Sequence, residues 1–261
     1  MFGSRTIGTA LVVVLLFIGG ATASLDDHSV QPDADARLGR ILSDWERRSS
    51  ARSSVDVRFT RTDCDTMWGD KKNYTGRVVL LPNGLALVEM MKRDRAGQVA
   101  ETDRFVWTSE EFHQFRAEQK MHVVLPIAEA DRGRLPAVLA LPFFWHLSVN
   151  GLKSRFRIEL LEERPETWVF RIKPLSDIGR QSLSTAFLSL DRSTFLPRQY
   201  CLISPDGKST KSFRVTEVRS PRSAPADLLA IPEDGDWNIQ RGVENQIMGW
   251  LVSLFKPDLL P

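Results

Sequence analysis

Four histidines are the side chains of this sequence best suited to acid–base or metal chemistry, and they are scattered: His28, His113, His122 and His146. None stands in the H-x-x-x-H or H-E-x-x-H spacing that turns two imidazoles toward one zinc ion. His113 and His122 lie near the ends of two predicted strands that pair as a hairpin, so their rings could face each other across it. With no acid fixed nearby, two surface histidines are the alternative.

Carboxylates are plentiful, but they do not form a catalytic pattern. Glu110–Glu111 and Glu162–Glu163 fall at predicted strand ends or turns, where charge is normally solvated. There is no G-x-S-x-G elbow for a nucleophilic serine, and no glycine-rich loop that could cradle the phosphates of a nucleotide. We therefore predict a protein that is not an enzyme and that carries no cofactor and no metal. A hydrolase would need two or three convergent polar side chains that the pattern does not show.

Two cysteines, Cys64 and Cys201, could form a disulfide in an oxidising compartment. A bridge requires Cα atoms about 4.4–6.8 Å apart, which a sequence does not reveal. Two buried or half-buried thiols are the alternative.

The N-terminal segment has the layout of a secretory signal peptide. Arg5 supplies a positive charge, residues 7–18 are apolar, and residues 19–23 (GGATA) provide small residues for cleavage. An uncleaved anchor helix is the alternative, although the apolar run is short for a span of about 20 residues. No cysteine follows that could carry a lipid anchor. We expect residues 1–23 to be removed and the mature protein to be periplasmic or secreted.

The charge balance argues against nucleic-acid binding. Without Arg5 the mature chain has 34 basic and 33 acidic residues, because the N-terminal segment contains no acid. No basic stripe interleaved with aromatic residues is present, as a nucleic-acid interface would need.

Most of the chain alternates apolar and polar residues with the period of two that is typical of half-buried strands. A strand begins at Val55, and the Pro82–Gly84 turn connects the next two. Short turns throughout favour an antiparallel meander, since parallel strands need long crossovers. About eleven strands are expected: from residue 55, then 73–80, 85–92, 102–108, 111–116, 120–125, 155–161, 167–173 and three within 184–218, with turns at Asp191–Thr194 and Pro205–Lys208.

Helical periodicity occurs in three places. Leu38, Ile41, Leu42 and Trp45 form one apolar stripe with Asp35 as a plausible N-cap. Residues 133–148 could form one or two short helices split at Pro142. Residues 243–255 also have a helical pattern. Such a helix could cover the edges of the sheet, or it could interact with a membrane. We predict a linker at 24–33, one domain at 34–240 and a C-terminal amphipathic helix or tail at 241–261.

The predicted strands have one bulky apolar face and one wet, basic face that carries Arg58, Arg104, Arg157, Arg171 and Arg214. A sheet with one apolar face cannot leave that face exposed to water, so it must curl and be covered by helices. The helical mass is small, so the concave side could keep an apolar ligand cavity; a core filled by the same side chains is the alternative. The candidate cavity residues are Val57, Phe59, Phe105, Trp107, Phe143, Phe144, Trp145, Phe156, Ile158, Trp168, Phe170, Leu188, Leu190, Phe213 and Val215, with Phe143, Phe144 and Trp145 as a lid or cavity wall.

Several phrases resemble the LolA-like superfamily of periplasmic lipoprotein-sorting proteins and their LolB, LppX and RseB relatives. They are FLSLDRSTFLPRQ (187–199), SPDGKSTKSFRV (204–215), NYTGRVVLLP (73–82) and DLLAIPEDGDW (227–237). The resemblance covers most of residues 38–240 and looks closest to the LolA-like domain of uncharacterised planctomycete secreted proteins.

The resemblance implies a strongly curved, incomplete antiparallel barrel of about eleven strands with helices capping its concave face, in a mainly β fold. It also implies a carrier for lipoprotein acyl chains or other lipids, served by a membrane-bound donor or acceptor protein. We expect a monomer. An RseB-like sensor or protein-interaction module with a filled core is the alternative on the same fold.

Overall fold

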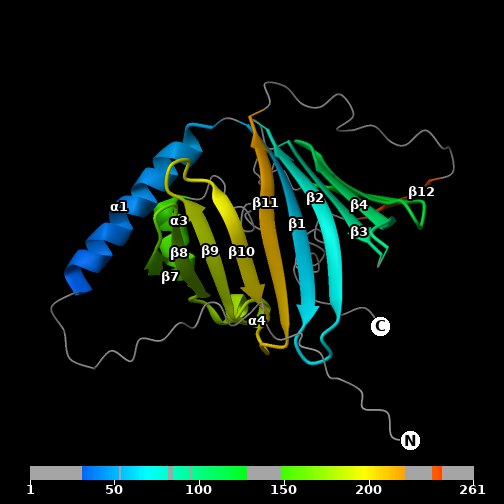
Figure 1. The fold of residues 1–261 in the computed structure, drawn as a ribbon. Coiled ribbons are helices and arrows are strands. Elements are labelled where there is room, and N and C mark those ends of the chain that lie inside the picture. Colours follow the sequence, from blue (N-terminus) through cyan, green and yellow to red (C-terminus); the bar gives the residue numbers. More distant parts are fainter. Residues whose placement is uncertain are drawn as a thin grey trace, which may run out of the picture.

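The computed structural model describes residues 31–52, 54–81, 85–94, 96–127, 148–220 and 237–242. These residues build one large open sheet of twelve strands with few helices (Figure 1). The strands are β1 (Val55–Asp65), β2 (Lys71–Leu80), β3 (Ala86–Arg93), β4 (Val99–Trp107), β5 (Glu111–Arg116), β6 (Met121–Pro126), β7 (Phe156–Glu163), β8 (Thr167–Pro174), β9 (Thr185–Asp191), β10 (Pro197–Ile203), β11 (Ser209–Arg219) and β12 (Asn238–Arg241).

Two antiparallel meanders make up the sheet. β1 to β6 form one and β7 to β11 the other, and β1 pairs with β11 to join them. The strands at the two ends of the order, β7 and β12, do not pair with each other, so the sheet stays open. The predicted mainly β fold with an incomplete barrel of about eleven antiparallel strands is therefore confirmed. The sequence did not predict β12, which pairs in parallel with β6.

The helix α1 (Gln31–Ser50) is longer than the sequence pattern suggested. Asp35 is not its N-cap, because the helix already begins at Gln31; Pro32 fits a first helical turn, where its missing N–H is not needed. Ile41, Leu42 and Trp45 bury the predicted stripe against the sheet.

Three polar contacts hold α1 and the residues that follow it. Arg37 forms an ion pair with Glu163 at the end of β7. At the other end, Arg48 and Arg52 donate to the backbone oxygens of Ser193 and Thr194, at 2.8 and 2.9 Å. The helix is thus held between the outermost strand of one meander and the β9–β10 turn.

Two short helices, α3 (Val149–Arg155) and α4 (Asp177–Ser182), lie at strand connections and were not predicted. Each begins after a serine N-cap, Ser148 and Ser176, whose hydroxyl accepts from a backbone N–H three residues later. The helices expected within 133–148 and 243–255, the Pro82–Gly84 turn and the signal segment lie outside the described residues, apart from the capping residue Ser148.

One face of the sheet, here called the inner face, carries the main apolar cluster. Leu42, Phe105, Phe112, Leu188 and Leu190 are among its members that are at most 1% exposed. Because successive strand residues point to opposite faces, their neighbours point to the other side, the outer face. The outer face was expected to be exposed to solvent, but it carries a second buried apolar cluster, formed by Val79, Leu81, Leu87, Val106 and Phe115.

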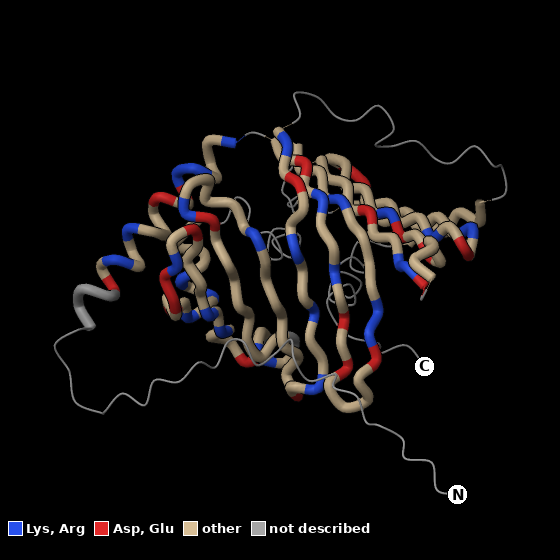
Figure 2. Tube along the Cα trace, in the orientation of Figure 1, with Lys and Arg blue, Asp and Glu red and all other residues tan. Residues whose placement is uncertain are grey.

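Charged residues of both signs are interspersed along the strands and turns of the chain rather than gathered into one block (Figure 2). Most arginines of the outer face have an acidic neighbour on the same or an adjacent strand, such as Arg77 with Asp56 at 2.9 Å. Within the described residues, no helix has the length and apolar character that a membrane crossing requires.

Candidate functional site

The predicted cavity residues come together on the inner face. All twelve that the structure describes belong to the main cluster, nine as buried members and Phe156, Ile158 and Val215 as half-buried neighbours. Phe143, Phe144 and Trp145 lie outside the described residues. The cluster extends from β7 through the centre of the sheet to β6, and the described helices add only Ile41, Leu42, Trp45 and Leu152 to its buried members.

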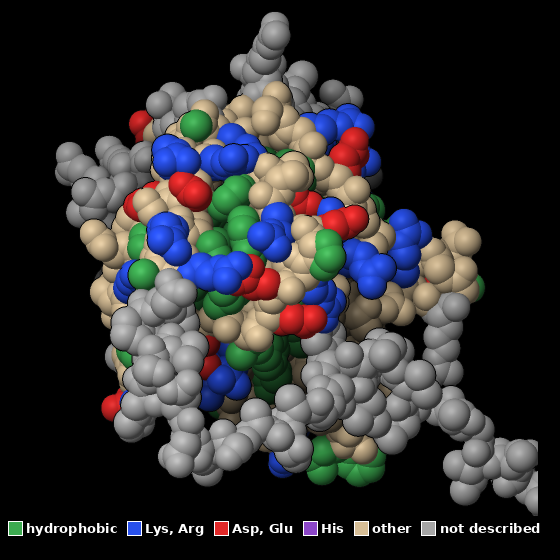
Figure 3. Space-filling model, turned by 60° about the vertical axis from the view of Figure 1, so that its left-hand side comes forward, with side chains coloured by type: hydrophobic (Ala, Val, Ile, Leu, Met, Phe, Trp, Pro, Cys, Tyr) green, Lys and Arg blue, Asp and Glu red, His purple; other side chains and the backbone are tan. Residues whose placement is uncertain are grey.

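A hollow is visible in the space-filling view that looks from the α1 side. Hydrophobic side chains line its depth, and basic and acidic side chains stand around it (Figure 3). This view is consistent with an inner face that is apolar within and charged at its margins.

Aromatic rings dominate the centre of the inner face. The rings of Tyr200 and Phe213 stack with centroids 4.3 Å apart, and Phe59 lies 5.8 Å from Phe213. Trp107 contacts Phe112 at 4.5 Å. Rings of this size bury large areas and dominate the free energy of an apolar surface.

One end of the inner face is polar, which the sequence reasoning missed. Arg61 is 7% exposed and binds Asp63 through two hydrogen bonds, with Nε donating to Oδ1 at 2.6 Å and Nη2 donating to Oδ2. The Arg61 guanidinium also lies 4.8 Å from the Tyr74 ring centroid. Lys211 is 6% exposed and stands opposite Asp63 in the β1–β11 register. A buried ion pair with an aromatic neighbour therefore borders the apolar surface.

The Trp107 indole carries a polar group into the apolar cluster. Its side chain is 1% exposed, and its Nε1–H has no hydrogen-bond partner in the structure as described. A buried donor without a partner costs about 1–3 kcal/mol. An acceptor oxygen placed beside it would recover that cost.

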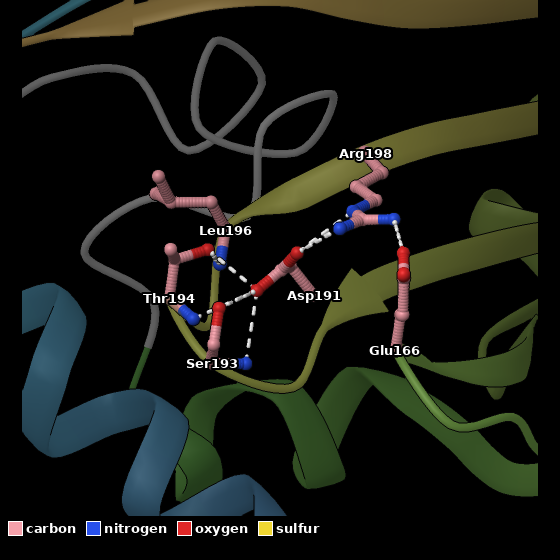
Figure 4. A network of polar contacts seen from close by, with 6 residues as sticks. All are labelled: Glu166, Asp191, Ser193, Thr194, Leu196 and Arg198. Atoms are coloured by element: carbon pink, nitrogen blue, oxygen red, sulfur yellow. Dashed lines mark hydrogen bonds and ion pairs between the residues drawn. The ribbon is translucent and has the colours of Figure 1, made fainter.

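A polar network joins the β9–β10 turn to the β7–β8 turn on the outer face (Figure 4). Asp191 Oδ1 accepts from the backbone N–H groups of Ser193 and Thr194 at 2.9 and 2.8 Å, and from both hydroxyls. Asp191 Oδ2 accepts from Arg198 Nε at 2.7 Å, while Arg198 Nη1 donates to Glu166 at 2.8 Å.

Burial of Asp191 raises the pKa of its carboxyl, but the hydrogen bonds from Ser193, Thr194 and Arg198 outweigh burial and hold that pKa well below its usual range. Asp191 is therefore ionised and serves as the anchor of the turn. The aspartate of the FLSLDRSTFLPRQ phrase is thus the residue that holds this turn together.

The two histidines of the predicted hairpin do face each other. Nδ1 of His113 lies 3.1 Å from Nε2 of His122, and Phe115 stacks on His122 with centroids 4.3 Å apart. His122 is 3% exposed, so it is not a surface residue. Burial is the main cause that lowers the pKa of both rings. The pair is neutral near pH 7 and part of the outer apolar packing.

Metal-ligating residues do not gather in the described parts of the chain, where no group of three or more histidines, cysteines or acids could hold an ion. Cys64 and Cys201 are free, half-buried thiols, so the disulfide alternative is wrong for this structure. They flank β11 from opposite sides, on β1 and β10. Two strand spacings of about 4.8 Å separate such positions, farther than the roughly 4.4–6.8 Å a bridge allows.

No protein-family model matches this chain, and no curated protein sequence matches it. Similar solved structures include an uncharacterized conserved protein from Thermus thermophilus, with 14% identity over 79% of this chain and 99% of that chain and a TM-score of 0.48. A LolA superfamily protein from Nitrosomonas europaea has 12% identity, 75% and 98% coverage and a TM-score of 0.35.

The MucA/MucB complex of Pseudomonas aeruginosa has 19% identity, 74% and 62% coverage and a TM-score of 0.42. The superfamily that the sequence phrases resemble is thus found among the structural matches too. At these identities and TM-scores, the likenesses carry no argument about function.

Proposed function

We propose that this protein is a non-catalytic carrier that binds acyl chains of lipids or lipidated proteins on the inner face of its sheet. The observation that supports the proposal most is the continuous apolar cluster of the inner face, with an ion pair and a buried lysine at one end. An amphiphile matches such a surface, with its chain on the apolar part and its headgroup toward Arg61.

Removal of hydrocarbon from water would drive binding, at about 0.8 kcal/mol for each buried CH₂. Apolar contacts are not directional, so chain length would be selected only weakly. The buried Trp107 Nε1–H favours ligands that bring an acceptor oxygen, such as an ester or amide carbonyl, over plain hydrocarbon.

The sequence resemblance and the N-terminal segment support a location outside the cytoplasm, where a carrier would meet a membrane-bound donor or acceptor. Release would then require separation of the elements packed on the inner face, because its central side chains are shielded from water.

A second function is favoured by that same burial. If the inner face is a filled core, the protein would act as a sensor or interaction module and bind another protein on a different surface. The carrier and the interaction module both predict the same buried residues. Only a measurement of ligand binding can therefore distinguish the two functions.

The test is direct extraction followed by probe binding. We expect organic extracts of the purified mature protein to contain lipid by mass spectrometry, and a dansyl-labelled undecanoic acid to bind saturably. Ile158→Asp, a half-buried inner position on β7, should weaken probe binding. Leu161→Asp on the same strand should leave it unchanged, since Leu161 is 44% exposed.

Circular dichroism would establish that both variants fold. Absence of lipid together with absence of saturable binding would overturn the carrier function and favour the interaction module. If a folded Ile158→Asp variant binds the probe as tightly as the wild type does, the binding site is not on the inner face near β7.

A further inference from the structure

A second cavity lies on the outer face beside the polar network, and Val215, which packs against the inner apolar cluster, also borders it. The cavity has a volume of about 700 Å³ and is lined by Arg164, Glu166, Ser189, Arg198, Gln199 and Arg214 among others. This volume is in the range of small-ligand sites, about 300–1,000 Å³. The lining differs from the inner face because three arginines border it.

Two of these arginines are held in place by acids. Arg198 is fixed between Asp191 and Glu166, as described above. Arg164 donates from Nε and Nη2 to the two carboxylate oxygens of Glu162, at 2.8 and 2.7 Å. Both arginines therefore already have carboxylate partners.

Arg214 differs from them. Its neighbours Phe213 and Val215 pack on the inner cluster, so Arg214 points to the outer face, where it is exposed. Within the described residues it has no ion pair or hydrogen bond, whereas every other arginine on a described strand has an acid or an amide oxygen within reach.

Arg214 also lies in a row of polar side chains across three strands. Gln199 pairs with Arg214 on one side and with Ser189 on the other. Directly opposed strand residues have Cβ atoms about 4.5–5.5 Å apart. A guanidinium, an amide and a hydroxyl can therefore reach one bound group.

Arg214 is the one cavity arginine that no carboxylate of the described residues binds. Three arginines border the cavity, and three carboxylates, on Glu162, Glu166 and Asp191, are bound to two of them. The acid of a ligand would pair with Arg214, but a multiply charged phosphate would also meet Glu166. A carboxylate offers the planar oxygen pair that a guanidinium binds through two parallel hydrogen bonds.

We propose that this outer cavity binds an extended peptide segment through one carboxylate side chain on Arg214, with Gln199 and Ser189 bonding to the same carboxylate or the adjacent peptide group. The partner is a protein that presents one acidic residue in an exposed segment. This site does not depend on ligand binding at the inner face.

The experiment uses the mature protein with ¹⁵N-labelled arginine and follows by NMR the Nε–H signals of Arg214 and of the other two cavity arginines, Arg164 and Arg198, which remain observable when Arg214 is replaced. The probe is an acetylated, amidated pentapeptide with one central Glu flanked by alanines, and its twin carries Gln instead. We expect saturable shifts with the Glu peptide, and affinity lower by about tenfold for the Gln twin and for Arg214→Gln, as loss of a charge-assisted pair implies. Arg40→Gln, an exposed arginine of α1, is the matched control and should bind as the wild type does.

Titrations with sodium acetate and inorganic phosphate distinguish a peptide site from a simple anion site. Weak, non-saturating shifts with both salts support the proposal. It is overturned if phosphate binds as tightly as the peptide, if the Glu and Gln peptides bind alike, or if Arg214→Gln binds like the wild type. None of these outcomes bears on the fatty-acid probe, so failure here and failure of the carrier function are separable.

Discussion

Gly76 provides a sharp test of how tightly the inner face is packed. It lies on β2 opposite Phe59 of β1. A Cβ atom at Gly76 would stand 2.2 Å from the tip of the Phe59 ring and 2.6 and 2.7 Å from the two adjacent ring carbons. The ring thus occupies the place that a side chain at position 76 would take, and only glycine allows this.

The cost of Gly76→Ala follows from that geometry. The nearest ring atom must retreat by about 1.2 Å to reach ordinary contact at 3.4 Å, and Phe59 is 3% exposed with Phe213 beside it. Overpacking of this kind costs about 1–3 kcal/mol. Alanine is better than glycine in a strand by about 0.5–1 kcal/mol. We expect a net loss of about 1–2 kcal/mol in the free energy of unfolding.

Urea unfolding followed by tryptophan fluorescence would measure this loss. In a Phe59→Ala background the added methyl has room, so Gly76→Ala should be neutral or slightly stabilising there. Gly39→Ala in α1 is the control, because nothing lies within 4 Å of its Cβ position, and it should stabilise the helix by up to about 1 kcal/mol. A Gly76→Ala protein as stable as the wild type, or equally destabilised in both backgrounds, would refute the reasoning.

Two further predictions concern the outer face. Asp191→Asn should cost about 2–3 kcal/mol at pH 7 through lost charge-assisted hydrogen bonds. The pKa of Asp191 is lowered in the folded protein, so the wild type should lose stability as the pH falls below about 4. The Asp191→Asn variant should lose less stability over the same range. Urea midpoints that decrease equally with pH in both proteins would contradict this. Burial lowers the pKa values of both histidines of the pair in the folded protein. Below about pH 6.5 the unfolded chain therefore binds more protons at these residues than the folded protein does, and the free energy of unfolding should decrease as the pH falls further. His122→Phe should flatten that decline in thermal melts, and a decline identical to that of the wild type would show that the pair does not titrate as described.

Local periodicity was enough to locate most of the sheet. The alternation that begins at Val55 works because each strand has one face on the main cluster, and all eleven predicted strands are present within a few residues of their expected bounds. β12 was missed because its four residues are all exposed and show no alternation. The pairing of β1 with β11 joins residues about 150 positions apart, and no local pattern encodes such a partner.

The outer apolar cluster could have been anticipated from a continuous apolar run. Residues 78–81 (VVLL), at and just after the end of β2, place large side chains on both faces of the sheet, a sign that both faces are covered. The polar end of the inner face also had a signal. Arg61 and Asp63 are two positions apart on one strand, so they share a face, and that face is set by Val57 and Phe59. The Arg61–Asp63 pair was missed because arginines were expected on the outer face of the sheet.

That polar end bears on the choice between a carrier and a filled core. A core that only has to fold gains little from Arg61 and Asp63, because replacing a buried ion pair by apolar residues is often neutral or stabilising. The same holds for Trp107, whose buried Nε1–H forms no hydrogen bond in the described structure, where phenylalanine would avoid the cost. An amphiphile on the inner face would use both features, with its headgroup at the ion pair and a carbonyl at the indole. Trp107→Phe should therefore weaken binding of an acyl ester more than binding of the matching alkane. A filled core predicts instead that Trp107→Phe alters stability alone, because neither ligand would bind.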